Sequence, residues 1–156
     1  MRIGVPTEVK PLEGRVGHTA VWVEYPAAGE PSFVKRQWRT FVNWFLGRNQ
    51  QVEGMIVWGG RDAADDLLGD GGFYRSADGA WIGLTDDNNA GEAPAPRTDH
   101  TAIWTEETMV VWGGIVTGSD ASDGTSNLDR GGEYKPSSRD WAILPSGGPA
   151  PRVGHT

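Results

Sequence analysis

The sequence predicts an all-β protein with two four-stranded antiparallel units. Glycine and proline are abundant, 23 and 10 among 156 residues, which is typical of many short elements joined by tight turns and argues against a helical bundle. A long motif is written twice and begun a third time. Such self-similarity is the signature of an architecture in which equal units stack on one another.

The motif has three parts. It opens with Arg, His and Trp at fixed spacing, in residues 15–22 (RVGHTAVW), 97–104 (RTDHTAIW) and, incompletely, 152–156 (RVGHT). An apolar run and a glycine pair follow, in residues 55–60 (MIVWGG) and 109–114 (MVVWGG). A second glycine pair, a Tyr and a Trp close each copy, in residues 71–81 and 131–141.

Each copy reads as four short strands. Their β-branched and aromatic residues, bounded by Gly, Asp and Pro, favour strands at 18–22, 55–58, 72–76 and 81–84, and again at 100–104, 109–112, 132–136 and 141–144. Asp78-Gly79 is a hairpin-turn signal, and residues 138–140 are its looser counterpart. The second strands, MIVW and MVVW, are apolar without alternation, which predicts burial on both faces.

Burial on both faces favours sheets packed radially, as in a β-propeller, over a sandwich. The order of the motif resembles the kelch repeat, in the Trp-rich form of galactose-oxidase-like propellers. The resemblance covers residues 15–156 apart from an insertion. It implies that the glycine pairs Gly59-Gly60 and Gly113-Gly114 allow a bend, and that Tyr74, Trp81, Tyr134 and Trp141 fill the space between blades.

The resemblance also divides the chain. We expect a leader at 1–14, a first blade at 15–84 with an insertion at about 23–54, a linker at 85–96, a second blade at 97–145, and a linker with the start of a third blade at 146–156. Propellers use about four to eight blades. We therefore expect the remaining blades to come from a longer chain, or the ring to close by self-association.

The insertion predicts one amphipathic helix over residues 32–47. Its apolar face carries Val34, Trp38, Phe41, Val42, Phe45 and Leu46, and its polar face Lys35, Arg36, Arg39 and Asn43. Packing on the propeller is the favoured interpretation. Contact of residues 33–46 with a membrane surface or a partner's groove is the alternative, with Trp38 and Arg39 as candidate contacts, and the segment being foreign to the domain is a third.

Residues 1–17 resemble the opening of alanine dehydrogenase. In that family the arginine matching Arg15 helps to hold a 2-oxo acid substrate. No dinucleotide fingerprint of the G-x-G-x-x-G kind follows a strand in this chain. Arg15 is equally explained as the repeat arginine that matches Arg97 and Arg152.

Three histidines share one repeat position, each three residues after an arginine: His18, His100 and His155. A metal site is one interpretation of residues that converge on an axis. A hydrogen-bond network between blades, which satisfies buried polar groups, is the favoured one. Only the second copy places a carboxylate, Asp99, beside its histidine, so the set is irregular as metal ligands.

Acidic residues gather in the loops between the second and third strands: Asp62, Asp65, Asp66 and Asp70, and in the second copy Asp120, Asp123 and Asp129. Neither loop has the spacing of a calcium loop, so solvated loop charge is the favoured interpretation and no cofactor is expected. Contact with a partner is the alternative, with these acids as the candidate binding residues. No general acid or base, nucleophile elbow or phosphate-binding loop is recognisable.

The function expected from this architecture is a noncatalytic binding scaffold for a protein or carbohydrate ligand. The alternative is a fragment of a propeller enzyme that oxidises, cleaves or epimerises carbohydrate. The net charge of −7 argues against a general nucleic-acid surface. Zero cysteines exclude disulfides and thiolate chemistry here, and no signal peptide or membrane span is visible.

Overall fold

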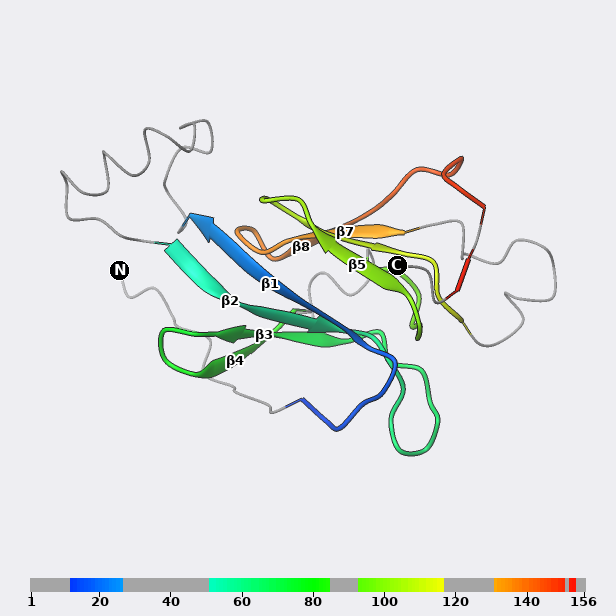
Figure 1. Cartoon of the computed structure of the whole chain (residues 1–156), viewed down its shortest axis with the longest axis horizontal. Coiled ribbons are helices and arrows are strands. Elements are labelled where there is room, and N and C mark those ends of the chain that lie inside the picture. Colours follow the sequence, from blue (N-terminus) through cyan, green and yellow to red (C-terminus); the bar gives the residue numbers. More distant parts are fainter. Residues whose placement is uncertain (1–11, 27–50, 85–92, 117–130, 151, 154–156) are drawn as a thin grey trace.

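A computed structural model describes residues 12–26, 51–84, 93–116, 131–150 and 152–153. This part of the chain is all-β and contains no helix (Figure 1). The strands are β1 (Thr19–Pro26), β2 (Gln51–Trp58), β3 (Gly71–Arg75), β4 (Ala80–Gly83), β5 (Thr101–Trp104), β6 (Met109–Trp112), β7 (Gly132–Lys135) and β8 (Asp140–Ile143). They form two four-stranded sheets, β1-β2-β3-β4 and β5-β6-β7-β8. The coarse prediction of two antiparallel four-stranded units is confirmed.

Both sheets are simple meanders with antiparallel neighbours throughout. The turn between β3 and β4 is the one that Asp78-Gly79 predicts. Gly79 has a φ of +70° and donates its N–H to the carbonyl of Arg75 at 3.0 Å. In the second sheet Arg139 takes the corresponding place with a φ of +63°. The repeat therefore tolerates a strained non-glycine residue at this turn.

The first hairpin is longer than the sequence predicts. β1 and β2 pair beyond Trp22 and Met55 as far as Pro26 and Gln51, well inside the segment expected to be an insertion. Burial explains the extension, because Val23 is fully buried and the Tyr25 ring lies 6.1 Å from that of Phe73. The helix expected over residues 32–47, with Trp38 and Arg39, lies outside the described residues.

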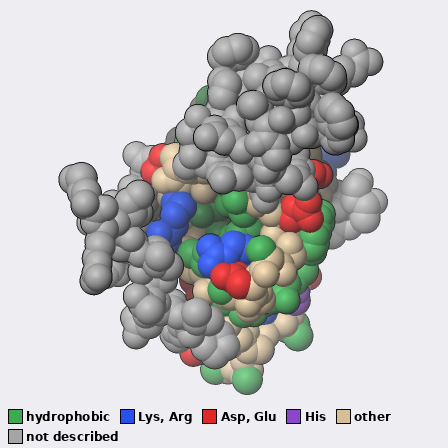
Figure 2. Space-filling view, turned by 90° about the vertical axis from the view of Figure 1, so that its left-hand side faces the viewer, with side chains coloured by type: hydrophobic (Ala, Val, Ile, Leu, Met, Phe, Trp, Pro, Cys, Tyr) green, Lys and Arg blue, Asp and Glu red, His purple; other side chains and the backbone are tan. Residues whose placement is uncertain are grey.

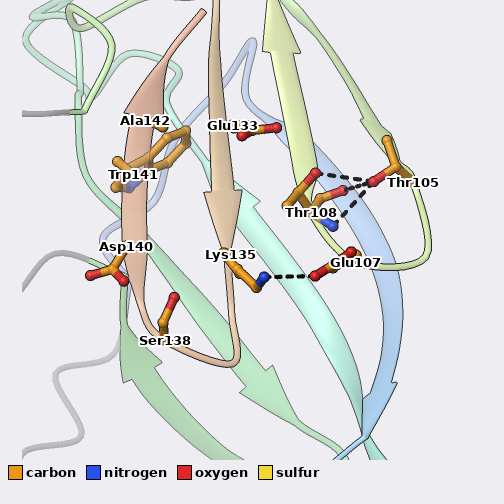
Figure 3. A pocket seen from close by; sticks show the side chains of 9 residues that line it. All are labelled: Thr105, Glu107, Thr108, Glu133, Lys135, Ser138, Asp140, Trp141 and Ala142. Atoms are coloured by element: carbon orange, nitrogen blue, oxygen red, sulfur yellow. Dashed lines mark hydrogen bonds and ion pairs between the residues drawn. The ribbon is translucent and has the colours of Figure 1, made fainter. Parts of the chain in front are cut away.

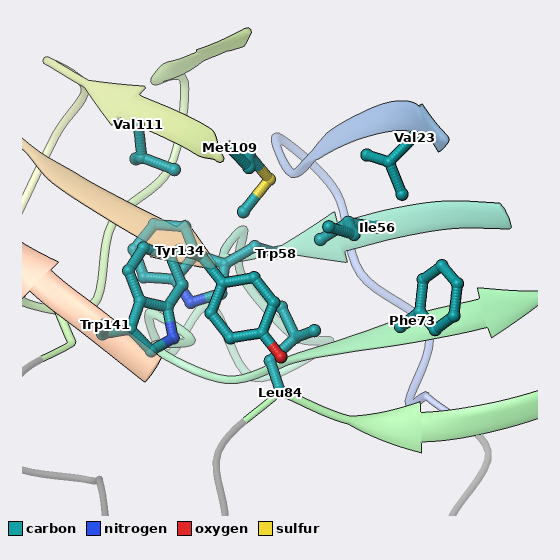
Figure 4. Packing of buried hydrophobic residues seen from close by; sticks show 9 residues of the cluster. All are labelled: Val23, Ile56, Trp58, Phe73, Leu84, Met109, Val111, Tyr134 and Trp141. Carbon is teal, nitrogen blue, oxygen red and sulfur yellow. The ribbon is translucent and has the colours of Figure 1, made fainter. Parts of the chain in front are cut away.

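The core lies between the two sheets (Figure 4). It comprises Val23, Ile56, Trp58, Phe73 and Leu84 from the first sheet and Met109, Val111, Tyr134 and Trp141 from the second. The rings of Trp58 and Trp141 meet across the interface with centroids 5.3 Å apart. Fully burying a side chain of this size contributes about 2 to 3 kcal/mol, so this cluster is the main source of cohesion between the sheets.

The two sheets contribute unlike faces to this core. Ile56 and Trp58 of β2 point toward the second sheet, whereas Val110 and Trp112, which hold the same repeat positions in β6, lie on the outer face. Met109 and Val111 of β6 point toward the first sheet, whereas Met55 and Val57, at the same repeat positions of β2, lie on the outer face, because side chains alternate along a strand. The sheets therefore pack head to tail. In residues 55–58 of β2 the inner face is buried, and on the outer face Val57 is buried and Met55 half-buried, close to the prediction. In β6 the inner face is buried but the outer face is only half-buried, so the prediction of burial on both faces was wrong there.

Candidate functional site

The glycine pairs directly follow β2 and β6 and lie at the same end of the two sheets. Gly59 and Gly60 have φ values of +68° and +98°, and Gly113 and Gly114 repeat them at +69° and +93°. A Cβ atom on Gly59 would lie 2.7 Å from His100 Cε1 and 2.9 Å from the Arg97 carbonyl oxygen. Backbone conformation and close packing both require glycine there.

The repeat arginines bind backbone carbonyls at this end of the sheets. Each donates from Nε to the carbonyl two residues earlier: Arg15 at 3.3 Å, Arg97 at 3.0 Å and Arg152 at 3.3 Å. Arg15 and Arg97 also donate from Nη1 to the first glycine of their own pair, Gly59 at 3.2 Å and Gly113 at 3.0 Å. Desolvation lowers the pKa of Arg97, which is 1% exposed, to about 10, so it stays charged at neutral pH.

Arg97 also ties the two sheets together. Its carbonyl accepts a hydrogen bond from Gly60 N–H at 2.8 Å, while its guanidinium holds the glycine pair of the second sheet. The Arg152 carbonyl accepts from Gly114 N–H at 3.1 Å in the same manner. The hydrogen bond from a glycine pair to the next repeat arginine, which joins the first sheet to the second, is therefore repeated after the second sheet.

His100 belongs to the same network. Its Nε2 is hydrogen-bonded to Thr19 Oγ1 at 2.7 Å, and its ring packs edge-on against Trp58 at 5.1 Å. Burial, with smaller contributions from the charges of Arg97 and His18, lowers its pKa to about 4. The imidazole is neutral at pH 7 and serves as an inter-sheet contact. His18, at the equivalent position, is exposed, and His155 lies outside the described residues.

The acidic loop of the first sheet is organised by arginines and by its own turn. Arg61 forms an ion pair with Asp65 at 2.9 Å and another at 3.5 Å with Asp99, which lies just before β5 of the second sheet. Asp62 Oδ1 accepts the N–H groups of Ala64 at 2.8 Å and Asp66 at 3.0 Å. The loop is thus fixed by its own turn and by a contact with the second sheet.

Asp70 pairs with Arg15 at 2.9 Å, on the other side of the same loop. Within the described ranges, no group of three or more His, Asp or Glu side chains is arranged to hold a metal ion. Asp120, Asp123 and Asp129 lie outside those ranges. Of the predicted acids that the structure describes, the carboxylates of Asp62, Asp65 and Asp70 therefore have protein partners, and Asp66 is exposed and bonds through its N–H group.

A shallow depression of about 400 Å³ lies on the outer face of the second sheet (Figure 3). Its lining is Thr105, Glu107, Thr108, Glu133, Lys135, Ser138, Asp140, Trp141 and Ala142. Lys135 Nζ donates to Glu107 Oε1 at 2.6 Å across it. Sequence reasoning missed this depression, although one signal was available: Glu133 stands where the first copy has the buried Phe73.

Charged pairs also mark the end of the molecule where β3 turns into β4. Figure 2 shows this side, with basic and acidic side chains next to one another among hydrophobic ones. Arg75 is bound there by both carboxylate oxygens of Asp78, at 2.8 Å and 2.5 Å. Such exposed pairs contribute little to stability.

Comparison with known proteins does not identify the chain: neither a family model nor a curated protein matches it. Among the residues that the structure describes, none forms a helix of the length and apolar character needed to cross a membrane. Function is therefore inferred from the repeat and from the geometry of the two sheets.

Proposed function

We propose that the chain is part of a kelch-type β-propeller and serves as a noncatalytic binding scaffold. The observation that carries the proposal is the head-to-tail packing of the two sheets through unlike faces. A contact between unlike surfaces leaves one surface of each kind unused, so the same contact can be made again with further sheets around an axis.

The glycine and arginine network supports the same interpretation. Gly60 N–H binds the Arg97 carbonyl, and Gly114 N–H binds the Arg152 carbonyl, so the connection to a following unit has the same form at both junctions. Leu12 and Pro94, each three residues before a repeat arginine, lie next to Gly72 and Gly132, which are equivalent glycines. A radial repeat accounts for these coincidences with one geometric rule.

The proposed ligand surface is formed by the loops next to the glycine pairs, at one end of the two sheets. It contains Arg61 together with Asp62, Asp65, Asp66 and Asp99, all held on a rigid base of two sheets. Arg97 donates to the Gly113 carbonyl, and His100 bonds Thr19 through Nε2 while its Nδ1 is buried without a hydrogen-bond partner. Both groups are buried in the junction, which favours binding over catalysis. Charged and hydrogen-bonding side chains suit a protein or carbohydrate ligand.

The test is to screen the chain against panels of oligosaccharides and peptides and to map any ligand by amide hydrogen exchange. We expect protection of residues 61–66 and 97–99, and an affinity about tenfold or more lower in Arg61→Ala, because a lost charged contact costs more than about 1.4 kcal/mol. Lys135→Ala, at the opposite end of the sheets, is the control. Protection confined to the Lys135 end, or turnover of a carbohydrate, would contradict the scaffold proposal.

A further inference from the structure

Each sheet has an outer face, on the side opposite to the shared core. The outer face of the first sheet carries Trp22, Met55, Val57, Tyr74 and Trp81, and that of the second carries Ile103, Val110, Trp112 and Glu133. Trp22 is 58% exposed and Ile103 is 54% exposed, so both present large apolar surfaces to solvent. Each lies on the first strand of its sheet, which is an edge strand.

The contact between β1 and β5 within the chain is a template for how these two positions are used. β1 and β5 lie side by side (Figure 1). Val21 and Tyr25 of β1 and Ala102 and Trp104 of β5 pack against the common core, with the Tyr25 and Trp104 rings 6.5 Å apart. Trp104 holds the repeat position of Trp22, and Val21 holds that of Ile103.

We therefore infer that a second copy of this chain docks head to tail, with Trp22 on β1 of one copy packing on Ile103 on β5 of the other. This inference rests on the proposed function, because it continues the stacking of the sheets from one chain to the next. The contact joins unlike faces, so each copy offers one of each and a chain of copies or a closed ring forms.

Two features of the molecule limit the strength of this contact. Gly148 lies against the Trp112 ring and Arg152 holds Gly114 N–H, where the Arg15 segment of an incoming copy would otherwise sit. Every copy also carries a net charge of −7. Association is therefore expected to be concentration-dependent and to strengthen with added salt, which screens the repulsion.

The experiment is sedimentation velocity on the full chain and on two variants, Trp22→Glu and Ile103→Glu. We expect the unaltered chain to associate, with each variant alone at least about tenfold weaker, since a buried apolar anchor is lost and a charge is placed in the contact. An equimolar mixture of the two variants should form a dimer and nothing larger. In that mixture one copy retains an intact β5 face and the other an intact β1 face.

The matched control is Ile143→Glu, because Ile143 is 44% exposed and lies on the face of the second sheet opposite to Ile103. This variant should associate like the unaltered chain. Urea denaturation of every variant shows whether the fold is retained, because Trp22 and Ile103 are exposed and their replacement should leave stability within about 1 kcal/mol.

A chain that stays monomeric at about 1 mM in high salt, or a variant mixture that stays monomeric, would overturn the inference. Amide hydrogen exchange separates this failure from failure of the scaffold proposal. If the N–H groups of Gly60 and Asp99, which bond across the junction to the Arg97 and Gly17 carbonyls, remain protected in the monomer, the two sheets still stack and only docking of the second copy is wrong. If they are unprotected, both proposals are wrong.

Discussion

Trp141 and Trp81 occupy the same position in the two sheets and have different surroundings. Each packs in a tilted arrangement against the tyrosine of its own sheet, Trp141 against Tyr134 with ring centroids 5.2 Å apart and Trp81 against Tyr74 at 5.4 Å. Trp141 is 1% exposed because it also packs on Trp58 of the other sheet, whereas Trp81 is half-buried. Local structure is the same in both copies, and burial is decided by the neighbouring sheet.

The histidines show the same contrast. His100 is 6% exposed and binds Thr19 of the first sheet, while His18 at the equivalent position is exposed. At the Trp and His positions of the repeat, full burial therefore requires a facing sheet. Four measurements test this relation between position and burial.

Replacing the two tryptophans should give the largest difference. Trp141→Ala removes a buried ring from the interface and should lower the free energy of unfolding by about 3 to 5 kcal/mol. Trp81→Ala removes a ring with less buried area and should cost about half as much or less. Urea denaturation followed by circular dichroism measures both. Equal losses in the two variants would mean that the facing sheet does not decide the contribution of this position.

The second measurement concerns His100 and pH. Its folded pKa of about 4 lies below the reference value of 6.5, so between these two values the unfolded chain binds a proton that the folded chain does not. The free energy of unfolding should therefore fall as the pH is lowered from about 6.5 to about 4, by about 3 kcal/mol in total.

Urea denaturation from pH 7.5 down to about 5 covers the upper part of that range. His100→Gln should be less stable than the unaltered chain at pH 7 and should show a flatter pH dependence. His18→Gln is the matched control, because it changes an exposed side chain at the same repeat position. An unchanged slope in His100→Gln would show that other groups cause the pH dependence.

The third measurement compares two glycines with nearly equal backbone conformation. Gly59 and Gly79 have φ values of +68° and +70°. A Cβ on Gly59 would meet His100 and the Arg97 carbonyl at less than 3 Å, whereas at Gly79 the nearest atom is Tyr74 Oη at 3.7 Å. Gly79→Ala should cost about 1 kcal/mol for the backbone conformation alone, and Gly59→Ala about 2 kcal/mol or more. Similar losses would show that the junction adapts to a methyl group.

Much of the strand pattern could be predicted from the sequence, because it depends on local signals. β-branched and aromatic runs located all eight strands, and Asp78-Gly79 located a turn. The longer first hairpin was missed, because Val23 and Tyr25 were assigned to an insertion that the second copy lacks. Their burial depends on contacts with Phe73 and with the second sheet, which no local pattern encodes.

The site was predictable only in part, for a similar reason. The repeated Arg and His positions indicated a hydrogen-bond network, and Arg97 and His100 do form contacts between the sheets. Except for Asp70, which pairs with Arg15, the acceptors of the repeat arginines are backbone carbonyls, which carry no sequence signal. The depression around Glu133 and Lys135 arises on a face whose counterpart in the first sheet is buried, and that difference appears only when the sheets are placed together.

The smallest expected effect concerns the ion pair in that depression. Lys135 and Glu107 are both exposed, so their 2.6 Å contact should contribute less than about 1 kcal/mol. Glu107→Gln should lower the free energy of unfolding by this small amount at low salt and by nearly nothing at about 0.5 M salt, because exposed charges are screened. Urea denaturation at both salt concentrations measures it. A large, salt-independent loss would mean that the outer face of the second sheet is covered by protein, as the inner face is, and that the two faces do not differ as described.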